Sequence, residues 1–179
     1  MPIELEKKYR LTEQRLAEVL RVLTDSSAID EGEEFEENII YGGGVLTDKN
    51  AVLRVRLVGG RAVLTYKKRL ENKGDIKHQE EVETEVADAE AIRQIVAELG
   101  FKPHLVYEKR RHTWQFRSVE VVIDRLPFGL YMEVEGPVTG IREAEMLLDL
   151  DDLETENETY PRLTSRMGKR SGDVIEARF

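Results

Sequence analysis

The chain has 179 residues and a mass of 20.6 kDa, which suits a single domain with a proper hydrophobic core. No apolar run approaches membrane-spanning length, the N-terminus does not resemble a signal peptide, and there is no cysteine for disulfides, thiolate metal sites or nucleophiles. A formal net charge of -9 disfavours a nonspecific nucleic-acid binder. We therefore expect one cytoplasmic domain over residues 1–179 that neither crosses a membrane nor binds nucleic acid.

The first predicted strand, residues 3–11, has one wholly charged face. Successive side chains of a strand point to opposite faces, so the even-numbered positions collect Glu4, Glu6, Lys8 and Arg10. The odd-numbered face carries the apolar side chains of Leu5 and Tyr9. A solvated polar face is the ordinary reason for such a pattern, so this strand alone predicts only a half-buried position in a sheet.

The following segments alternate between helix and strand. Thr12 suits the N-cap of an amphipathic helix over residues 13–24, where leucine and valine recur at helical spacing. An acidic connection leads into a strand at residues 38–41, and three consecutive glycines then mark a loop. Residues 51–57 and 61–69 alternate apolar and charged side chains on either side of a glycine pair, which predicts a β-hairpin.

The second half of the chain continues this alternation. Further strands are predicted at residues 80–86, 106–117, 119–124 and 130–135. Asp88 can cap a helix that ends at Gly100, and later helices are expected at residues 141–150 and 160–170. Most strands are joined by short turns and are therefore antiparallel, which predicts an α+β fold.

Charge recurs at every second residue in strand after strand, opposite an apolar face. The basic members are Lys8, Arg10, Arg54, Arg56, Lys67, Lys109, Arg111 and Arg117. The acidic members are Glu4, Glu6, Glu81, Glu83, Asp124, Glu133 and Glu135. Either these faces look outward, or the sheet closes into a barrel with a charged lumen and helices over its apolar outer face. We favour the barrel, because amphipathic helices need an apolar partner and the strands supply it.

A lumen that holds both signs of charge indicates a ligand that complements both. Carboxylates supply the oxygen ligands that Mg²⁺ or Mn²⁺ accepts together with phosphate oxygens, while arginine and lysine bind phosphate directly. A metal-bound polyphosphate fits this description. Competing signals are weak, because the glycine run lacks the Lys-Ser/Thr of a phosphate loop and the histidines lack metal-ligand spacing. Trp114 and Phe116 are expected to pack under a helix.

Several motifs follow one another in a specific order. They are Glu4-x-Glu6-x-Lys8, Leu53-Arg54-Val55-Arg56, Tyr66-Lys67, Glu81-x-Glu83, Gly100-Phe101, Lys109-x-Arg111, Asp124 and Gly129-x-Tyr131-x-Glu133-x-Glu135. This order resembles the CYTH superfamily, which includes class IV adenylyl cyclases and thiamine triphosphatases and belongs to the triphosphate tunnel metalloenzymes. The resemblance covers about residues 2–136, with a looser match at Thr159-Tyr160.

The resemblance implies a closed antiparallel eight-stranded β-barrel with charges pointing inward and helices on its flanks. It implies metal binding by the residues Glu4, Glu6, Asp124, Glu133 and Glu135, with further acidic lining from Glu81 and Glu83. It implies triphosphate binding by Lys8, Arg54, Arg56, Lys67, Lys109 and Arg111. In family triphosphatases a tyrosine paired with a lysine helps to activate water, and by position Tyr41 would pair with Lys109 here.

These expectations favour a Mg²⁺- or Mn²⁺-dependent hydrolase of inorganic tripolyphosphate or a small organic triphosphate such as thiamine triphosphate, acting as a monomer or homodimer. The alternative is a class IV adenylyl cyclase that makes cyclic AMP and pyrophosphate from ATP, because residues 35–41 and the helix exit at residues 99–101 resemble that branch. A further alternative is a noncatalytic module that binds polyphosphate or nucleotide.

Overall fold

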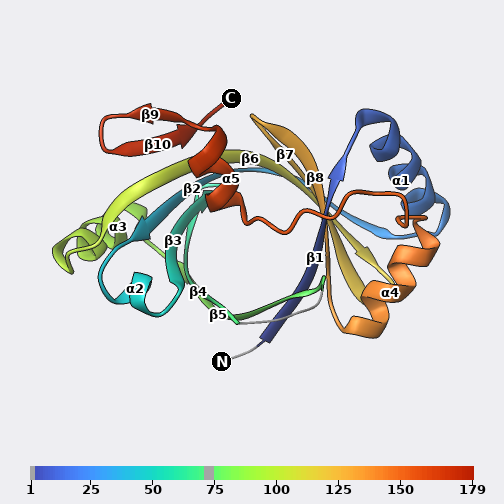
Figure 1. The fold of residues 1–179 in the computed structure, drawn as a ribbon, viewed down its shortest axis with the longest axis horizontal. Coiled ribbons are helices and arrows are strands. Elements are labelled where there is room, and N and C mark those ends of the chain that lie inside the picture. Colours follow the sequence, from blue (N-terminus) through green and yellow to red (C-terminus); the bar gives the residue numbers. More distant parts are fainter. Residues whose placement is uncertain (1–2, 71–74) are drawn as a thin grey trace.

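Eight strands close into an antiparallel barrel in the computed structural model, which describes residues 3–70 and 75–179 (Figure 1). They are β1 (Ile3–Leu11), β2 (Ile29–Gly42), β3 (Ala51–Val58), β4 (Arg61–Arg69), β5 (Lys77–Val86), β6 (Lys102–Phe116), β7 (Val119–Leu126) and β8 (Gly129–Glu135). The order is β2-β3-β4-β5-β1-β8-β7-β6, and pairing of β6 with β2 closes the ring. The predicted barrel is confirmed.

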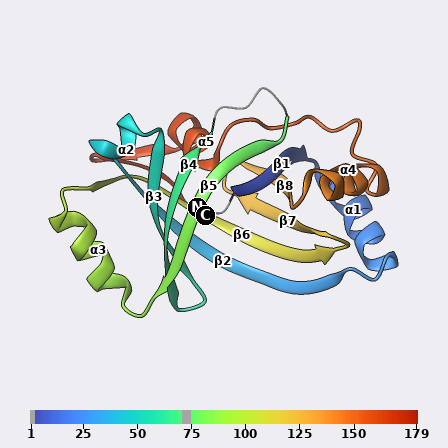
Figure 2. The ribbon, with the colours of Figure 1, turned by 90° about the horizontal axis from the view of Figure 1, so that it is seen from below.

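Five helices surround the barrel in the described residues (Figure 2). They are α1 (Glu13–Asp25), α2 (Val45–Asp48), α3 (Ala89–Glu98), α4 (Val138–Leu147) and α5 (Tyr160–Met167). The predicted caps form, since Thr12 accepts a hydrogen bond from the Arg15 amide and Asp88 accepts from the Glu90 and Ala91 amides. None of these helices is long and apolar enough to cross a membrane.

Apolar side chains pack outside the barrel, as the predicted alternation requires. Under α1 and α4 the main cluster includes Leu23 and Ile141, which are fully buried, together with the outward-facing Trp114, Phe116, Val121, Met132 and Val134. A second cluster places Val96 of α3 against Ile39, Val55 and Val106. Because the helices take up the apolar faces, the charged faces are left to the interior.

The C-terminal segment crosses one end of the barrel (Figure 1). After α4 the chain pairs with β1, where the Arg10 amide donates to the Glu154 carbonyl and the Glu156 amide donates to the Lys8 carbonyl. The helix α5 then inserts Tyr160 and Leu163 into an apolar cluster with Ile40, Leu105, Tyr107 and Tyr131. The hairpin of β9 (Lys169–Ser171) and β10 (Val174–Ala177) ends the chain, with β10 parallel to β6.

The largest departure from the predicted elements is β2, which begins at Ile29 rather than near residue 38. Its first half is acidic and exposed, so no apolar periodicity marks it. This half is held by pairing with β6, which runs from Ile29 opposite Gln115 to Gly42 opposite Lys102.

The ends of other elements shift less: α4 covers Val138–Leu147 and α5 ends at Met167, whereas the short α2 was not predicted. Gly59 and Gly60 have φ of 54° and 78°, which gives the predicted hairpin turn its left-handed backbone.

Candidate functional site

Strand register brings charged side chains from neighbouring strands together inside the barrel. Residues directly opposite in an antiparallel pair lie on the same face, and Lys8 of β1 lies opposite Glu133 of β8. In the same way Arg111 of β6 lies opposite Asp124 of β7. The closed ring therefore collects the charged faces of all its strands in one enclosed space.

This space contains a cavity of about 980 Å³. The predicted site residues that line it are Glu4, Glu6, Lys8, Arg54, Arg56, Lys67, Glu81, Glu83, Lys109, Arg111, Glu133 and Glu135. Asp124 lies behind the wall, with none of its surface exposed, and Tyr41 does not reach the cavity. A charged lumen of the predicted composition is therefore present, apart from these two positions.

Asp124 anchors the basic side chains of β6. Both of its carboxylate oxygens accept from Arg111, over 2.8 Å from Nε to Oδ1 and 2.6 Å from Nη2 to Oδ2, in a bidentate pair. Lys109 Nζ lies 3.2 Å from Oδ1, and the Tyr160 hydroxyl donates to Oδ2 over 2.9 Å. With its oxygens shared among these three donors, Asp124 is placed to fix the orientation of Arg111 and Lys109.

Glu36 belongs to the same network, although the sequence did not single it out. It is 2% exposed and lies 3.4 Å from Lys109 Nζ and 3.5 Å from Arg56 Nη1. Burial opposes its ionisation, but Lys109, Arg111 and Arg56 together lower the pKa of Glu36 to about 2. Its position could have been found by extending the alternation of Asn38 backward through the acidic stretch.

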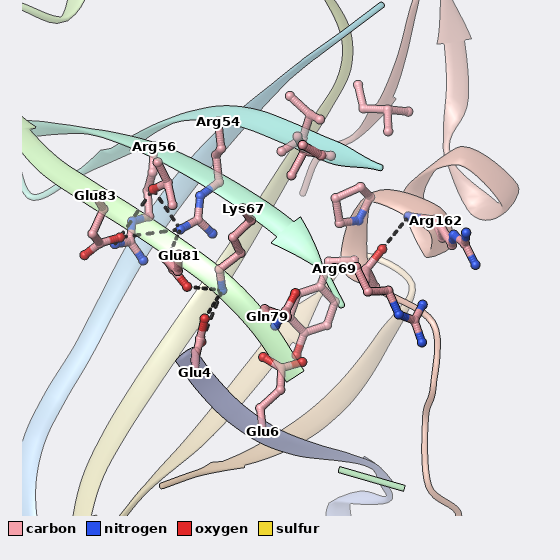
Figure 3. A pocket seen from close by; sticks show the side chains of 18 of the residues that line it. Glu4, Glu6, Arg54, Arg56, Lys67, Arg69, Gln79, Glu81, Glu83 and Arg162 are labelled. Atoms are coloured by element: carbon pink, nitrogen blue, oxygen red, sulfur yellow. Dashed lines mark hydrogen bonds and ion pairs between the residues drawn. The ribbon is translucent and has the colours of Figure 1, made fainter. Parts of the chain in front are cut away.

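Two carboxylates of the cavity wall, Glu4 and Glu81, share one lysine (Figure 3). Lys67 Nζ lies 2.9 Å from Glu4 Oε2 and 2.7 Å from Glu81 Oε2. Burial and the neighbouring Glu4 carboxylate raise the pKa of Glu135 to about 8. Burial, followed by the hydrogen bond with Glu81, also raises the pKa of Glu4, against the effect of Lys67. In this acidic cluster (Glu4, Glu81 and Glu135), Lys67 does not balance three ionised carboxylates, so Glu135 retains its proton up to about pH 8.

Glu6 and Glu133, two further acidic residues of the cavity, each have a cationic partner outside this cluster. Lys77, which the sequence did not single out, lies 3.1 Å from Glu6 Oε1. Lys8 Nζ lies 3.1 Å from Glu133 Oε1, and Arg111 Nη2 donates to Glu133 Oε2 over 2.7 Å. These cations hold the pKa of Glu133 well below its usual range even though burial raises it. No three acidic or histidine side chains of the described residues already form a metal cage.

The arginines of β3, Arg54 and Arg56, line the cavity beside Lys67 and Glu81 (Figure 3). Arg54 Nη2 donates to the Thr65 hydroxyl over 3.1 Å and lies 3.9 Å from Glu81 Oε1. Arg56 Nη2 lies 3.3 Å from Glu83 Oε2. Both guanidinium groups thus face the cavity with partners that leave part of their donor fork free.

The predicted pair of Tyr41 with Lys109 is wrong in this structure. Tyr41 lies opposite Leu53 on the outer face of the barrel, packed with Val96 of α3, because its neighbour Ile40 takes the inward position. Tyr160 is the tyrosine beside the lysines instead. Its ring centroid lies 3.7 Å from Lys8 Nζ and 5.3 Å from Lys109 Nζ, and the ring is nearly buried.

Comparison with known protein families gives a match over most of the chain. The family model for the CYTH domain matches residues 2–161. A protein of Methanocaldococcus jannaschii, named "Putative adenylate cyclase MJ0240", is 31% identical over 119 residues, which make up 65% of this chain and 67% of that protein.

Solved structures share the fold over nearly their whole length. PH1012 from Pyrococcus horikoshii has a TM-score of 0.77 at 25% identity, covering 89% of this chain and 98% of that one. HpAC1 from Hippeastrum, described as a "putative adenylyl cyclase" that "reveals a dominant" triphosphatase activity, has a TM-score of 0.69 at 18% identity, with 96% and 98% coverage.

The raised pKa of Glu135 predicts a pH-dependent stability. Below about pH 4.5 the carboxyl is protonated in both the folded and unfolded chain, so it has no effect. As pH rises from 4.5 to about 8, the unfolded chain releases this proton while the folded chain retains it, so the free energy of unfolding falls. We expect Glu135→Gln to be more stable than the wild type in EDTA, by a margin that grows over this range.

Denaturant unfolding at several pH values measures this margin. Glu85→Gln removes an exposed carboxyl at the end of β5 and serves as the matched control. A constant difference between Glu135→Gln and the wild type across the range would contradict the raised pKa.

Proposed function

The chain belongs to the CYTH domain family, and on that basis we propose that it is a divalent-metal-dependent hydrolase of triphosphates. The observation that carries the proposal is the division of the cavity into an acidic cluster (Glu4, Glu81 and Glu135) and a wall of arginines and lysines. A triphosphate with its cation complements both parts at once.

The acidic cluster has suitable chemistry for Mg²⁺ or Mn²⁺. Hard divalent cations take carboxylate oxygens together with phosphate oxygens. Such a cation would stabilise the ionised forms of Glu4 and Glu135, whose raised pKa values show that the neighbouring side chains do not. When bound, the ion would supply charge neutralisation at the phosphate oxygens. Glu6 and Glu133 were also expected as ligands. Each pairs with a lysine of its own, whereas Glu4 and Glu81 share Lys67, so we assign Glu6 and Glu133 to holding Lys77 and Lys8.

The basic side chains are assigned to binding and orienting the phosphates. Arg54 and Arg56 offer guanidinium donors that match phosphate oxygens in bidentate fashion. Arg111 is held rigidly by Asp124 and is suited to stabilise charge that develops on the transferring phosphoryl group. We therefore propose that Asp124, expected as a metal ligand, acts as a positioning residue for Arg111 and Lys109.

Lys109 is the candidate for orienting the attacking water. It is 1% exposed, and burial together with the Arg111 charge lowers the pKa of its ammonium group. The lowered pKa makes the neutral amine, which can accept a proton from water, easier to form. Its ion-pair partners Asp124 and Glu36 fix the direction of the side chain. Attack of that water on the terminal phosphorus would break the bond to the bridging oxygen and release inorganic phosphate.

One feature of the cavity keeps adenylyl cyclase as the second candidate. Toward α2 and α5 the cavity wall becomes apolar, through Ile40, Leu46, Val52, Leu105 and Pro161. At about 980 Å³ the cavity reaches the upper range of pockets that hold drug-sized ligands. A nucleoside could occupy this part, and its 3′-hydroxyl could then attack the α-phosphate in place of water. The names of the relatives divide between these two activities.

A combined product assay separates the candidates. Purified protein with Mg²⁺ or Mn²⁺ is given tripolyphosphate, thiamine triphosphate or ATP, and phosphate, pyrophosphate and cyclic AMP are measured together. We expect phosphate release that disappears in EDTA. Formation of cyclic AMP with equimolar pyrophosphate from ATP would show that the protein is a cyclase and not a hydrolase. Binding without turnover would identify a noncatalytic module.

Two variants test the assigned roles within the cavity. Arg56→Ala is expected to raise KM for the triphosphate about tenfold, because one charge-assisted contact is worth roughly 1.5–3 kcal/mol. Glu135→Gln is expected to abolish metal-dependent turnover, because it removes a cation ligand. Arg61→Ala removes a half-exposed arginine at the β3–β4 turn, outside the cavity, and should leave the kinetics unchanged. Wild-type kinetics in both cavity variants would contradict the assignment.

A further inference from the structure

Two arginines at the α5 end of the cavity differ from the other cations that line it. Arg69 extends from the end of β4, and Arg162 extends from the first turn of α5. Both line the cavity, and Figure 3 shows them on the α5 side, with Lys67 between them and Arg56. The triphosphate-binding role proposed above uses neither of them.

The difference lies in their ion pairs. The other lining lysines and arginines each have a carboxylate within 4 Å; they are Lys8, Arg54, Arg56, Lys67, Lys109 and Arg111. Within residues 3–70 and 75–179, neither Arg69 nor Arg162 has such a partner. The wall around them, from α2, the start of β3 and α5, contributes Thr47, Asn50 and Ser165 but no carboxylate. Among the described residues, this end of the cavity therefore carries positive charge without a paired carboxylate.

The positions of the two arginines continue the basic wall. Arg69 is two residues from Lys67 on the same face of β4, a distance of about 6.8 Å along an antiparallel strand. Guanidinium groups bind phosphate oxygens through charge-assisted, often bidentate, hydrogen bonds.

We propose that Arg69 and Arg162 form a second anion site, which receives the phosphoryl groups of a linear inorganic polyphosphate beyond the three held in the barrel. The substrate class is thereby narrowed to polyphosphates of four or more phosphoryl groups. This inference rests on the proposed binding of a triphosphate by the same cavity. In this proposal the α5 end of the cavity binds phosphate, whereas a nucleotide would place its nucleoside there.

Tripolyphosphate and tetrapolyphosphate are the probes that test the site. Their kcat/KM values are measured from phosphate release with Mg²⁺, and their Kd values by titration calorimetry in EDTA, where binding is read without turnover. For the wild type we expect tetrapolyphosphate to be favoured about tenfold in both quantities, the effect of one added charge-assisted contact. In Arg69→Gln/Arg162→Gln the preference should vanish, while the values for tripolyphosphate change less than about twofold.

The matched control is Arg21→Gln/Arg170→Gln, which removes the same two charges from exposed positions on α1 and β9. It should keep the preference, since distant surface charges are screened. Arg162 is itself exposed, so Arg162→Gln alone provides a variant that folds even if the double variant does not, and it should show an intermediate preference.

The possible results separate this inference from the hydrolase proposal. A wild type without preference for tetrapolyphosphate, or a double variant that weakens both probes equally, would overturn the second anion site. A selective loss of ATP binding in the double variant would also overturn it, in favour of a nucleotide site. Preferential binding of tetrapolyphosphate with no release of phosphate would instead retain the anion site and reject the hydrolase.

Discussion

Charge balance inside the closed barrel is the constraint on which this structure depends. A charged side chain removed from water is costly unless it is paired, so a barrel that turns its charged faces inward must match them strand by strand. The bidentate pair of Arg111 with Asp124, supported by Lys109 and Tyr160, is the most completely satisfied part of that match. Where the match is incomplete, the molecule has positions suited to a ligand.

The incomplete positions have opposite sign and lie in different parts of one cavity. The acidic cluster of Glu4, Glu81 and Glu135 is short of positive charge, and the pair Arg69 and Arg162 is short of negative charge. On the outer face of β1, by contrast, Lys7 contacts Glu145 and lies 2.5 Å from Asp75, so the single charge on that face is fully compensated. The unpaired and incompletely paired charges of the barrel interior thus border the cavity, which supports a ligand role over a purely structural one.

Alternation of residue types was enough to predict the barrel and most of its lining, because a period of two assigns every side chain of a strand to a face. It failed where that period is hidden. The acidic start of β2 has no apolar face, so Glu36 was missed. The pairing of Tyr41 with Lys109 came from the family resemblance, and in the structure Ile40 takes the inward position. Tyr160 reaches the lumen from α5 through a long connection, and no local pattern reports such a tertiary contact.

The most direct test of the central claim is to locate a cation and a phosphate chain in the barrel. Crystals grown with Mn²⁺ and tripolyphosphate can be examined by anomalous diffraction, which identifies manganese independently of the protein. We expect the manganese peak beside Glu4 and Glu135, with the phosphates against Arg54, Arg56 and Lys67. Manganese and phosphate bound only outside the barrel, with the charged lumen unchanged, would contradict the claim that this lumen is a metal–triphosphate site.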